Sequence, residues 1–286
     1  MVQTRFMARP HIEFIQSQVL PYRQDLYAAR SGASVRILSR DPDDGAASTM
    51  IRYPAGWSLP EPQALAADEE LFVLEGAVSL NGQLFGKHHY AHLPAGYLRE
   101  SMTAETETVV LTFFSQEPDA APAQDFNDAR LVAHLDTRAM PGQTGKRKHM
   151  KSGDWDPSGT IHKTLFLDPE TEERTWLIGL MPYWHSPMIE KHPVVEEEFA
   201  VLGDICFPNG VMRDGGYFWR PPGIEHGPFG TWGGTLHLCR CKGGPFSAEV
   251  RDGGSPNWTP DYDPILPDDL RAYVDAGRDY DTEPNH

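Results

Sequence analysis

The sequence predicts an all-β protein that contains one strand-rich unit twice. Three observations carry this prediction. The chain of 286 residues repeats itself at one constant offset. Its apolar stretches are short and are bounded by Gly and Pro, of which there are 26 and 25. Helical periodicity is nearly absent before residue 267.

The repeat is the strongest of these observations. The segment "SGASVRILSRDP" (31–42) aligns with "SGTIHKTLFLDP" (158–169), an offset of 127 residues from 31 to 158. The same offset, without a gap, aligns "EELFVLEG" (69–76) with "EEEFAVLG" (196–203), "LPAGYLR" (93–99) with "RPPGIEH" (220–226), and "TVVLTFF" (108–114) with "TLHLCRC" (235–241). Chance does not hold one register through four segments, so the repeated units span about 31–114 and 158–241.

The individual elements follow from local composition. Segments rich in β-branched and aromatic residues, such as "TWLIGLM" (175–181) and "GYFWRP" (216–221), predict strands. "PDDLRAYVDAG" (267–277) predicts a short C-terminal helix, capped by Asp268 or Asp269 and ended by Gly277. The boundaries we expect are an N-terminal unit at 1–118, a linker and lead-in segment at 119–157, a C-terminal unit at 158–250 and a tail at 251–286.

Charge and composition exclude several classes of partner. With 25 Lys and Arg against 41 Asp and Glu, the net charge of −16 repels a phosphate backbone or an anionic membrane surface. No apolar run approaches the roughly 20 residues of a membrane span, and the first residues lack the apolar segment of a signal peptide. The odd number of cysteines, Cys206, Cys239 and Cys241, fits buried thiols in a reducing compartment. We therefore expect a cytoplasmic protein.

One charged stretch raises a question about metal binding. "EKHPVVEEEFAVLG" (190–203) places Glu190, His192 and Glu196 at even-numbered positions, which an extended chain with a short turn can direct to one interior. His226 follows a Pro-Pro-Gly turn on a distant strand. Two imidazoles and a carboxylate suit a non-haem Fe(II) with open coordination positions. The alternative is that the histidines are half-buried and the glutamates form a solvated strand edge.

The two segments resemble the two motifs of the cupin family. The first motif is Gly, five residues, His-x-His, three or four residues, Glu, six residues, Gly. The second is Gly, five residues, Pro-x-Gly, two residues, His, three residues, Asn. This chain matches them at His192, Glu196, Gly203, Gly215, Pro221, Gly223 and His226, and it departs from them at Trp184, Glu190 and Gly230.

The resemblance covers roughly residues 30–245 and implies a bicupin, with two tandem jelly-roll β-barrels. The run "GGYFWRPPGIEHGPFG" (215–230) also resembles the cupin barrel of zinc-binding anti-sigma factors and cupin-type dioxygenases. The resemblance implies that His192, Glu196 and His226 hold a divalent metal. Glu190, which stands where cupins usually have a histidine, is either a fourth ligand or a base beside the metal. We expect Glu197 and Glu198 to be structural or surface groups.

The first unit acts as an internal control. The residues that align with Glu190, His192, Glu196 and His226 are Gln63, Leu65, Glu69 and Arg99. Leucine cannot coordinate a metal and arginine stays protonated, so we expect no metal in this barrel. We predict that Glu69 and Arg99 pair where the metal would otherwise lie. His88, His89 and His92 do not align with ligand positions, and we expect them on the surface or in packing contacts.

Three functions are compatible with these residues. The leading hypothesis is a non-haem Fe(II) dioxygenase that acts on a small aromatic or diketone-like substrate with O₂. Zn, Mn or Ni at the same site would support a redox-neutral isomerase or lyase. A closed zinc site would instead support a non-catalytic sensor. Cupins often associate through exposed strand edges, so we also expect a homodimer.

Overall fold

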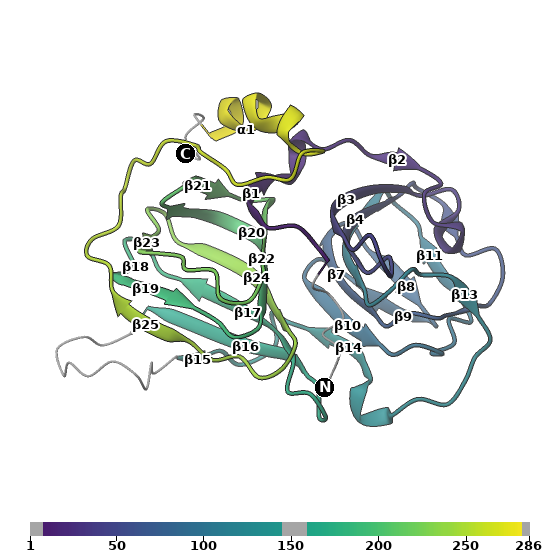
Figure 1. The fold of residues 1–286 in the computed structure, drawn as a ribbon. Coiled ribbons are helices and arrows are strands. Elements are labelled where there is room, and N and C mark those ends of the chain that lie inside the picture. The colour runs from purple at the N-terminus through teal and green to yellow at the C-terminus, as the bar shows by residue number, and fades with distance from the viewer. Residues whose placement is uncertain (1–7, 145–158, 282–286) are drawn as a thin grey trace. The chain divides into compact units, whose positions relative to one another are not determined.

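The computed structural model describes residues 8–144 and 159–281, which form two compact units. The first unit contains residues 20–140 and the second contains residues 10–19 and most of the chain after residue 141. Each unit is a barrel of antiparallel strands, shown in Figure 1. The tandem β-barrel architecture predicted from the sequence is therefore confirmed.

The first unit has one seven-stranded sheet, one four-stranded sheet and a pair of short strands. The seven-stranded sheet has the order β14-β10-β7-β12-β4-β3-β2, and the four-stranded sheet has the order β5-β11-β8-β9. Its strands are β2 (Arg23–Gln24), β3 (Ser34–Arg40), β4 (Ala47–Tyr53), β5 (Trp57–Ser58), β6 (Ala64–Leu65), β7 (Glu69–Glu75), β8 (Val78–Leu80), β9 (Gln83–Phe85), β10 (His89–Leu93), β11 (Met102–Ala104), β12 (Thr108–Phe114), β13 (Ala120–Ala121) and β14 (Val132–Asp136), and its 3₁₀ helices are η2 (Ala28–Arg30) and η3 (Asp128–Arg130).

The second unit has a ten-stranded sheet whose main path is β1-β22-β20-β24-β17-β16-β15, and a separate pair, β19 with β25. Its strands are β1 (Ile12–Gln16), β15 (Gln143–Thr144), β16 (Thr160–Leu167), β17 (Arg174–Leu180), β18 (His185–Ser186), β19 (Met188–Lys191), β20 (Val195–Phe207), β21 (Gly210–Arg213), β22 (Gly216–Arg220), β23 (Phe229–Gly230), β24 (Thr235–Lys242) and β25 (Glu249–Asp252), and its helices are η1 (Ser17–Val19), η4 (Arg271–Tyr273) and α1 (Val274–Asp281).

The strand nearest the N-terminus belongs to the second unit. β1 pairs antiparallel with β22, with Ile12 opposite Trp219 and Gln16 opposite Gly216. Figure 1 shows this strand, in purple, beside the green strands of the second barrel. All five residues of β1 are buried. This pairing carries Glu13 into a barrel whose other strands come from the distant second half of the sequence.

The backbone repeats at the offset found in the sequence. Isolated antiparallel bridges join Gln63 to Arg99 in the first unit and Glu190 to His226 in the second, and these two pairs are equivalent. Nearby, Gly96 N donates to the Leu65 carbonyl (2.9 Å), as Gly223 N does to that of His192 (2.8 Å). Both glycines have positive φ, of 85° and 81°. The repeat therefore superimposes turn on turn as well as strand on strand.

Each barrel has its own apolar core. The first includes Tyr53, Leu71 and Phe114, and the second includes Phe14 and Phe218. The three cysteines are free and buried, as the sequence predicted. Within the described residues, no helix is both long enough and apolar enough to cross a membrane.

The C-terminal helix exists, but its predicted bounds were wrong. A 3₁₀ turn begins after Leu270 without a side-chain cap, and α1 continues through Gly277 to Asp281. Asp268 and Asp269 therefore do not cap it. A Cβ atom at Gly277 would lie 2.8 Å from the hydroxyl of Tyr262, so this glycine allows close packing rather than ending the helix.

Candidate metal centre

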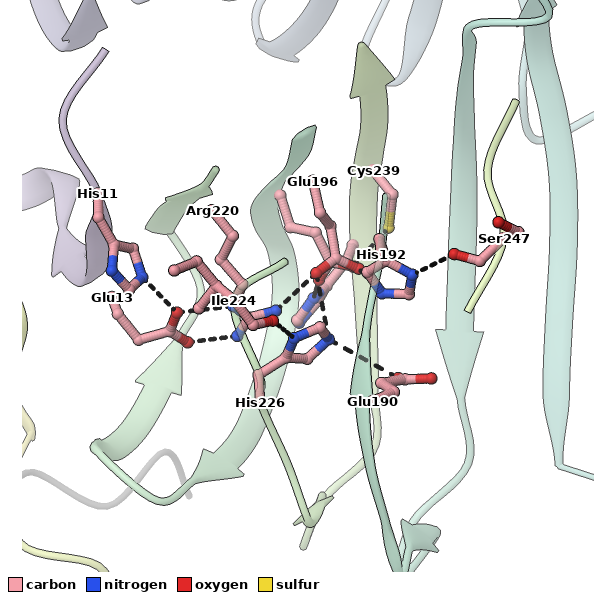
Figure 2. A network of polar contacts seen from close by, with 12 residues as sticks. His11, Glu13, Glu190, His192, Glu196, Arg220, Ile224, His226, Cys239 and Ser247 are labelled. Carbon is pink, nitrogen blue, oxygen red and sulfur yellow. Dashed lines mark hydrogen bonds and ion pairs between the residues drawn. The ribbon is translucent and has the colours of Figure 1, made fainter. Parts of the chain in front are cut away.

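The four residues singled out in the sequence come from three neighbouring segments of the second barrel. Glu190 lies on β19 and Glu196 on β20, while His192 lies in the turn between these strands. His226 follows the turn after β22, and two backbone hydrogen bonds of 2.9 Å tie it to Glu190. Figure 2 shows the four side chains converging from these segments.

Three of the four side chains form a compact group of possible ligands. One ligand atom each from Glu190, His192 and His226 lie within 4.8 Å of one another. The three residues are 9%, 4% and 8% exposed. Two imidazoles and a carboxylate, nearly enclosed, are a donor set that suits a divalent transition metal.

Hydrogen bonds orient both imidazoles toward the centre of this group. Nδ1 of His192 lies 2.7 Å from the Ser247 carbonyl oxygen, and Nδ1 of His226 lies 3.1 Å from that of Ile224. A carbonyl only accepts, so each Nδ1 donates and the neutral ring keeps its lone pair on Nε2. Nε2 of His192 is buried and has no hydrogen-bond partner among the described residues.

The neighbours of the two Nε2 atoms are carboxylate oxygens. Glu196 places one oxygen 3.4 Å from Nε2 of His192 and the other 3.3 Å from Nε2 of His226. An oxygen of Glu190 lies 3.9 Å from Nε2 of His226. Lone pairs that face carboxylates need a proton or a cation between them. The residues therefore fit a metal ion on the chemistry of their donors and on the orientation of Nε2 of His192.

Glu196 also belongs to a buried ion-pair network. Nη1 of Arg220 donates to Glu196 (2.8 Å), while Nε (2.6 Å) and Nη2 of Arg220 both donate to Glu13. Nε2 of His11 lies 3.1 Å from the same carboxylate of Glu13. Figure 2 shows the chain of contacts from His11 through Arg220 to His226. Arg220 thus holds the oxygen of Glu196 that faces Nε2 of His226, while the other oxygen faces His192.

The net charge of this cluster is negative and favours the binding of a cation. Glu13, Glu190 and Glu196 contribute three carboxylates, and Arg220 contributes one guanidinium. When every carboxylate is ionised and both imidazoles are neutral, the cluster carries a net charge of minus two. Buried charges require compensation, and one divalent cation supplies it.

The pKa shifts have the directions that this network imposes. Burial raises the pKa of Glu196, but the charges of His226 and His192 outweigh burial and hold it well below its usual range. Burial similarly opposes the ion pair at Glu13, where Arg220 lowers the pKa to about 2. Both carboxyl groups therefore remain ionised ligands or anchors near neutral pH.

The two histidines shift in opposite directions. Burial lowers the pKa of His226, and the Arg220 charge adds to this effect. For His192, burial also favours the neutral ring, but Glu196 outweighs it and raises the pKa. The lowered pKa of His226 favours the neutral ring that can coordinate a metal, whereas the raised pKa of His192 means that a metal would compete with a proton for its Nε2.

Three further residues contribute to the candidate metal centre and were not predicted from the sequence. Glu13 has no counterpart in the repeat and lies 207 residues from its partner Arg220. Arg220 carried a faint signal, because it sits within the second motif next to Pro221. Phe246, whose ring stacks on His192 with centroids 4.2 Å apart, lies beyond the repeated segments.

Glu197 and Glu198 have structural partners, as expected. Glu197 is 1% exposed and accepts hydrogen bonds from Tyr217 (2.7 Å) and Arg240. Glu198 faces the barrel interior, where it bonds Nδ1 of His237 (2.6 Å) and Sγ of Cys239 (3.1 Å).

The equivalent position in the first barrel is filled by arginine. Arg99 donates from Nε (2.9 Å) and Nη2 (2.6 Å) to one oxygen of Glu69, which confirms the predicted pair. Arg30, which the sequence did not indicate, donates to the other oxygen (2.6 Å) and to the Tyr53 hydroxyl (3.1 Å). Glu69 and both arginines are at most 1% exposed. This carboxylate is therefore fully compensated by protein cations.

The histidine-rich segment of the first unit makes packing contacts, as expected. His88 stacks on Phe72 with ring centroids 5.4 Å apart. Nδ1 of His89 lies 2.8 Å from Nε2 of His134, and Nδ1 of His92 lies 2.6 Å from a backbone carbonyl. Within the described residues, these histidines do not belong to a group with metal-binding geometry.

Comparisons with known proteins identify the fold class as cupin. A candidate dioxygenase from Nostoc punctiforme superimposes with a TM-score of 0.74 at 18% identity, over 87% of this chain and 92% of that one. A cupin 2 conserved barrel protein from Leptotrichia buccalis gives 0.52 at 8% identity, over 82% and 98%. A point mutant of oxalate decarboxylase from Bacillus subtilis gives 0.51 at 11% identity, over 84% and 79%.

The amino-acid sequence assigns the chain to a protein family. Residues 14–247 match the domain of unknown function DUF4437, and the chain belongs to that family. No curated protein matches the chain. The structural likenesses, all below 25% identity, establish the fold, while the chemistry depends on the residues of the second barrel.

Proposed function

We propose that the second barrel binds one divalent metal ion and that the protein is a metal-dependent enzyme acting on a small organic molecule. His192, His226 and Glu196 would hold the ion, with Glu190 as a fourth ligand or an adjacent base. The observation that supports this most is the pair of Nε2 lone pairs directed at carboxylates of a cluster with net negative charge. The reaction we favour is Fe(II)-dependent dioxygenation of an aromatic or diketone-like substrate.

The bound ion would supply Lewis-acid activation of a carbonyl or enol oxygen and a site for O₂. The residues of the chain supply position and charge. The carbonyls of Ser247 and Ile224 hold the imidazole rings in place, and Arg220 keeps Glu196 ionised and fixed. The carboxylate of Glu190, 9% exposed, would take a proton from an acidic C–H or O–H group of the substrate.

One feature favours an alternative. If Glu190 coordinates together with His192, Glu196 and His226, the protein itself provides four ligands, which is the closed arrangement of structural zinc sites. A four-ligand site would suit a zinc-binding sensor, and a five- or six-coordinate Mn or Ni site would suit a redox-neutral isomerase or lyase. The structural likeness to a candidate dioxygenase supports the oxidative reaction by analogy of fold.

The test is oxygen uptake by metal-free protein reloaded anaerobically with Fe(II) or with Zn(II). A panel of β-diketones and phenolic ketones should produce substrate-dependent oxygen consumption with Fe(II) only. His226→Ala serves as the control, because it removes a ligand without touching Arg220 or Glu13. A protein that retains Fe(II) and never consumes oxygen would contradict the dioxygenase and favour the redox-neutral or sensor function.

A further inference from the structure

Arg174 projects into the same interior as the candidate metal ligands. It is the first residue of β17, where it pairs with Cys241 of β24, and Cys241 in turn pairs with Glu196 of β20. Side chains of directly paired residues lie on one face of a sheet. Two strand spacings of about 4.8 Å each therefore separate the Arg174 and Glu196 backbones.

Two aromatic rings hold the guanidinium of Arg174. Its central carbon lies 4.2 Å from the ring centre of Trp176 and 4.9 Å from that of Phe246. Phe246 also stacks on His192, with ring centres 4.2 Å apart. Phe246 thus contacts both the guanidinium of Arg174 and the candidate metal ligand His192. Stacking restricts the guanidinium before any ligand arrives, which reduces the entropy cost of binding.

The guanidinium has no anionic partner in the described part of the chain. Nε of Arg174 is buried without a hydrogen-bond partner, and no carboxylate of residues 8–144 or 159–281 forms an ion pair with this side chain. Other arginines of the same barrel are paired: Arg220 with Glu13 and Glu196, and Arg240 with Glu197. Arg174 is also partly exposed, so its remaining N–H groups are accessible.

We propose that Arg174 binds a carboxylate group of the organic substrate whose other end reaches the metal. The proposal rests on the proposed function, since it needs a metal ion beside His192. A guanidinium presents parallel N–H donors that match a planar carboxylate. Glu196 and Glu198, which lie on the same sheet face as Arg174 and its neighbour Trp176, disfavour more highly charged anions such as phosphate esters. The substrate class is therefore a keto or phenolic acid with a single carboxylate.

The test compares two diketones that differ only in the carboxylate. Acetylacetone is neutral, and 2,4-dioxopentanoate has a carboxylate in place of one terminal methyl group. Affinities of both are measured by calorimetry on Fe(II)-loaded protein without oxygen, with metal content determined on the same samples. We expect wild type to prefer the acid, and Arg174→Gln to lower affinity for the acid about ten- to hundredfold while leaving acetylacetone binding and metal content unchanged.

Two further variants sharpen the comparison. Arg174→Lys keeps the charge but loses the planar fork, so it should recover only part of the affinity for the acid. Arg271→Gln removes an exposed charge paired with Asp268 in the C-terminal 3₁₀ turn and should change neither affinity. This control separates a local effect of Arg174 from a change in net charge.

The outcomes separate the two proposals. Equal loss of affinity for both diketones in Arg174→Gln, or no loss for the acid, would overturn the role of Arg174 while the metal site stands. Wild-type protein that holds no metal ion would overturn the proposed function and this inference together, and the metal analysis shows that result independently of ligand binding.

Discussion

The two barrels solve the same electrostatic problem in different ways. Each has a buried glutamate at the same place in the repeat, Glu69 in the first and Glu196 in the second. In the first barrel, Arg30 and Arg99 neutralise the carboxylate. In the second, His226 stands where Arg99 would be, and Arg220 is shared with Glu13.

The difference teaches that the arginines around the buried glutamate decide whether the compensating cation is part of the chain. An arginine at the position of Arg99 carries a permanent charge on a covalent tether, and with Arg30 it leaves a net positive cluster around Glu69. A histidine at the position of His226 can be neutral and can donate a lone pair. The same backbone bridge then supports a site that, under the proposed function, takes its cation from solution.

The largest effect should follow from breaking the first cluster. Glu69→Gln leaves two fully buried guanidiniums facing a neutral amide, and uncompensated buried charge typically costs about 3–5 kcal/mol. Hydrogen exchange of peptides from β7 should show this loss in the free energy of opening. Metal binding by the other barrel should not change.

The equivalent change in the second barrel is the matched control. In metal-free protein, Glu196→Gln removes one partner of Arg220 but leaves it bonded to Glu13 through two nitrogens. Its cost in opening free energy should be the smaller of the two. Equal costs would contradict the view that the first cluster compensates its charge internally while the second does not.

A smaller effect should appear with pH. Burial raises the pKa of Glu69, but Arg30 and Arg99 outweigh burial and lower it below its usual range. Its contribution to stability is therefore complete above the ordinary glutamate pKa of about 4.3 and is lost as the pH falls through the lowered value, by up to about 1.4 kcal/mol per unit. After correction for the intrinsic exchange rate, the free energy of opening at β7 should fall in acid more steeply for wild type than for Glu69→Gln. The same pH dependence in wild type and Glu69→Gln would contradict a stabilising role for the ion pairs of Glu69 with Arg30 and Arg99.

Much of the fold could be predicted because the repeat consists of local sequence patterns, namely turn glycines and short strands. Turn glycines such as Gly96 and Gly223 keep their spacing, and short strands between them leave few alternatives to a barrel. Motif spacing predicted that Glu196 lies close to both His192 and His226. The pairing of Glu69 with Arg99 followed from chemistry at the aligned positions.

What could not be predicted depends on long-range contacts. The addition of β1 to β22 brings Glu13 to Arg220, and Arg30 reaches Glu69 from a 3₁₀ turn without a repeat signature. Sequence spacing says nothing about which distant strand completes a sheet. The C-terminal helix was predicted, but its end was not, because the packing of Gly277 against Tyr262 outweighs the helix-ending preference of glycine.

The stoichiometry of divalent metal binding tests the central claim most directly. Protein freed of metal and titrated with Fe(II) without oxygen, or with Zn(II), should bind one ion per chain. His226→Arg, which copies the first barrel, should bind none, whereas Arg99→His should still bind one, because Arg30 remains beside Glu69. An ion retained by His226→Arg, a second ion in wild type, or no ion in wild type would contradict the account.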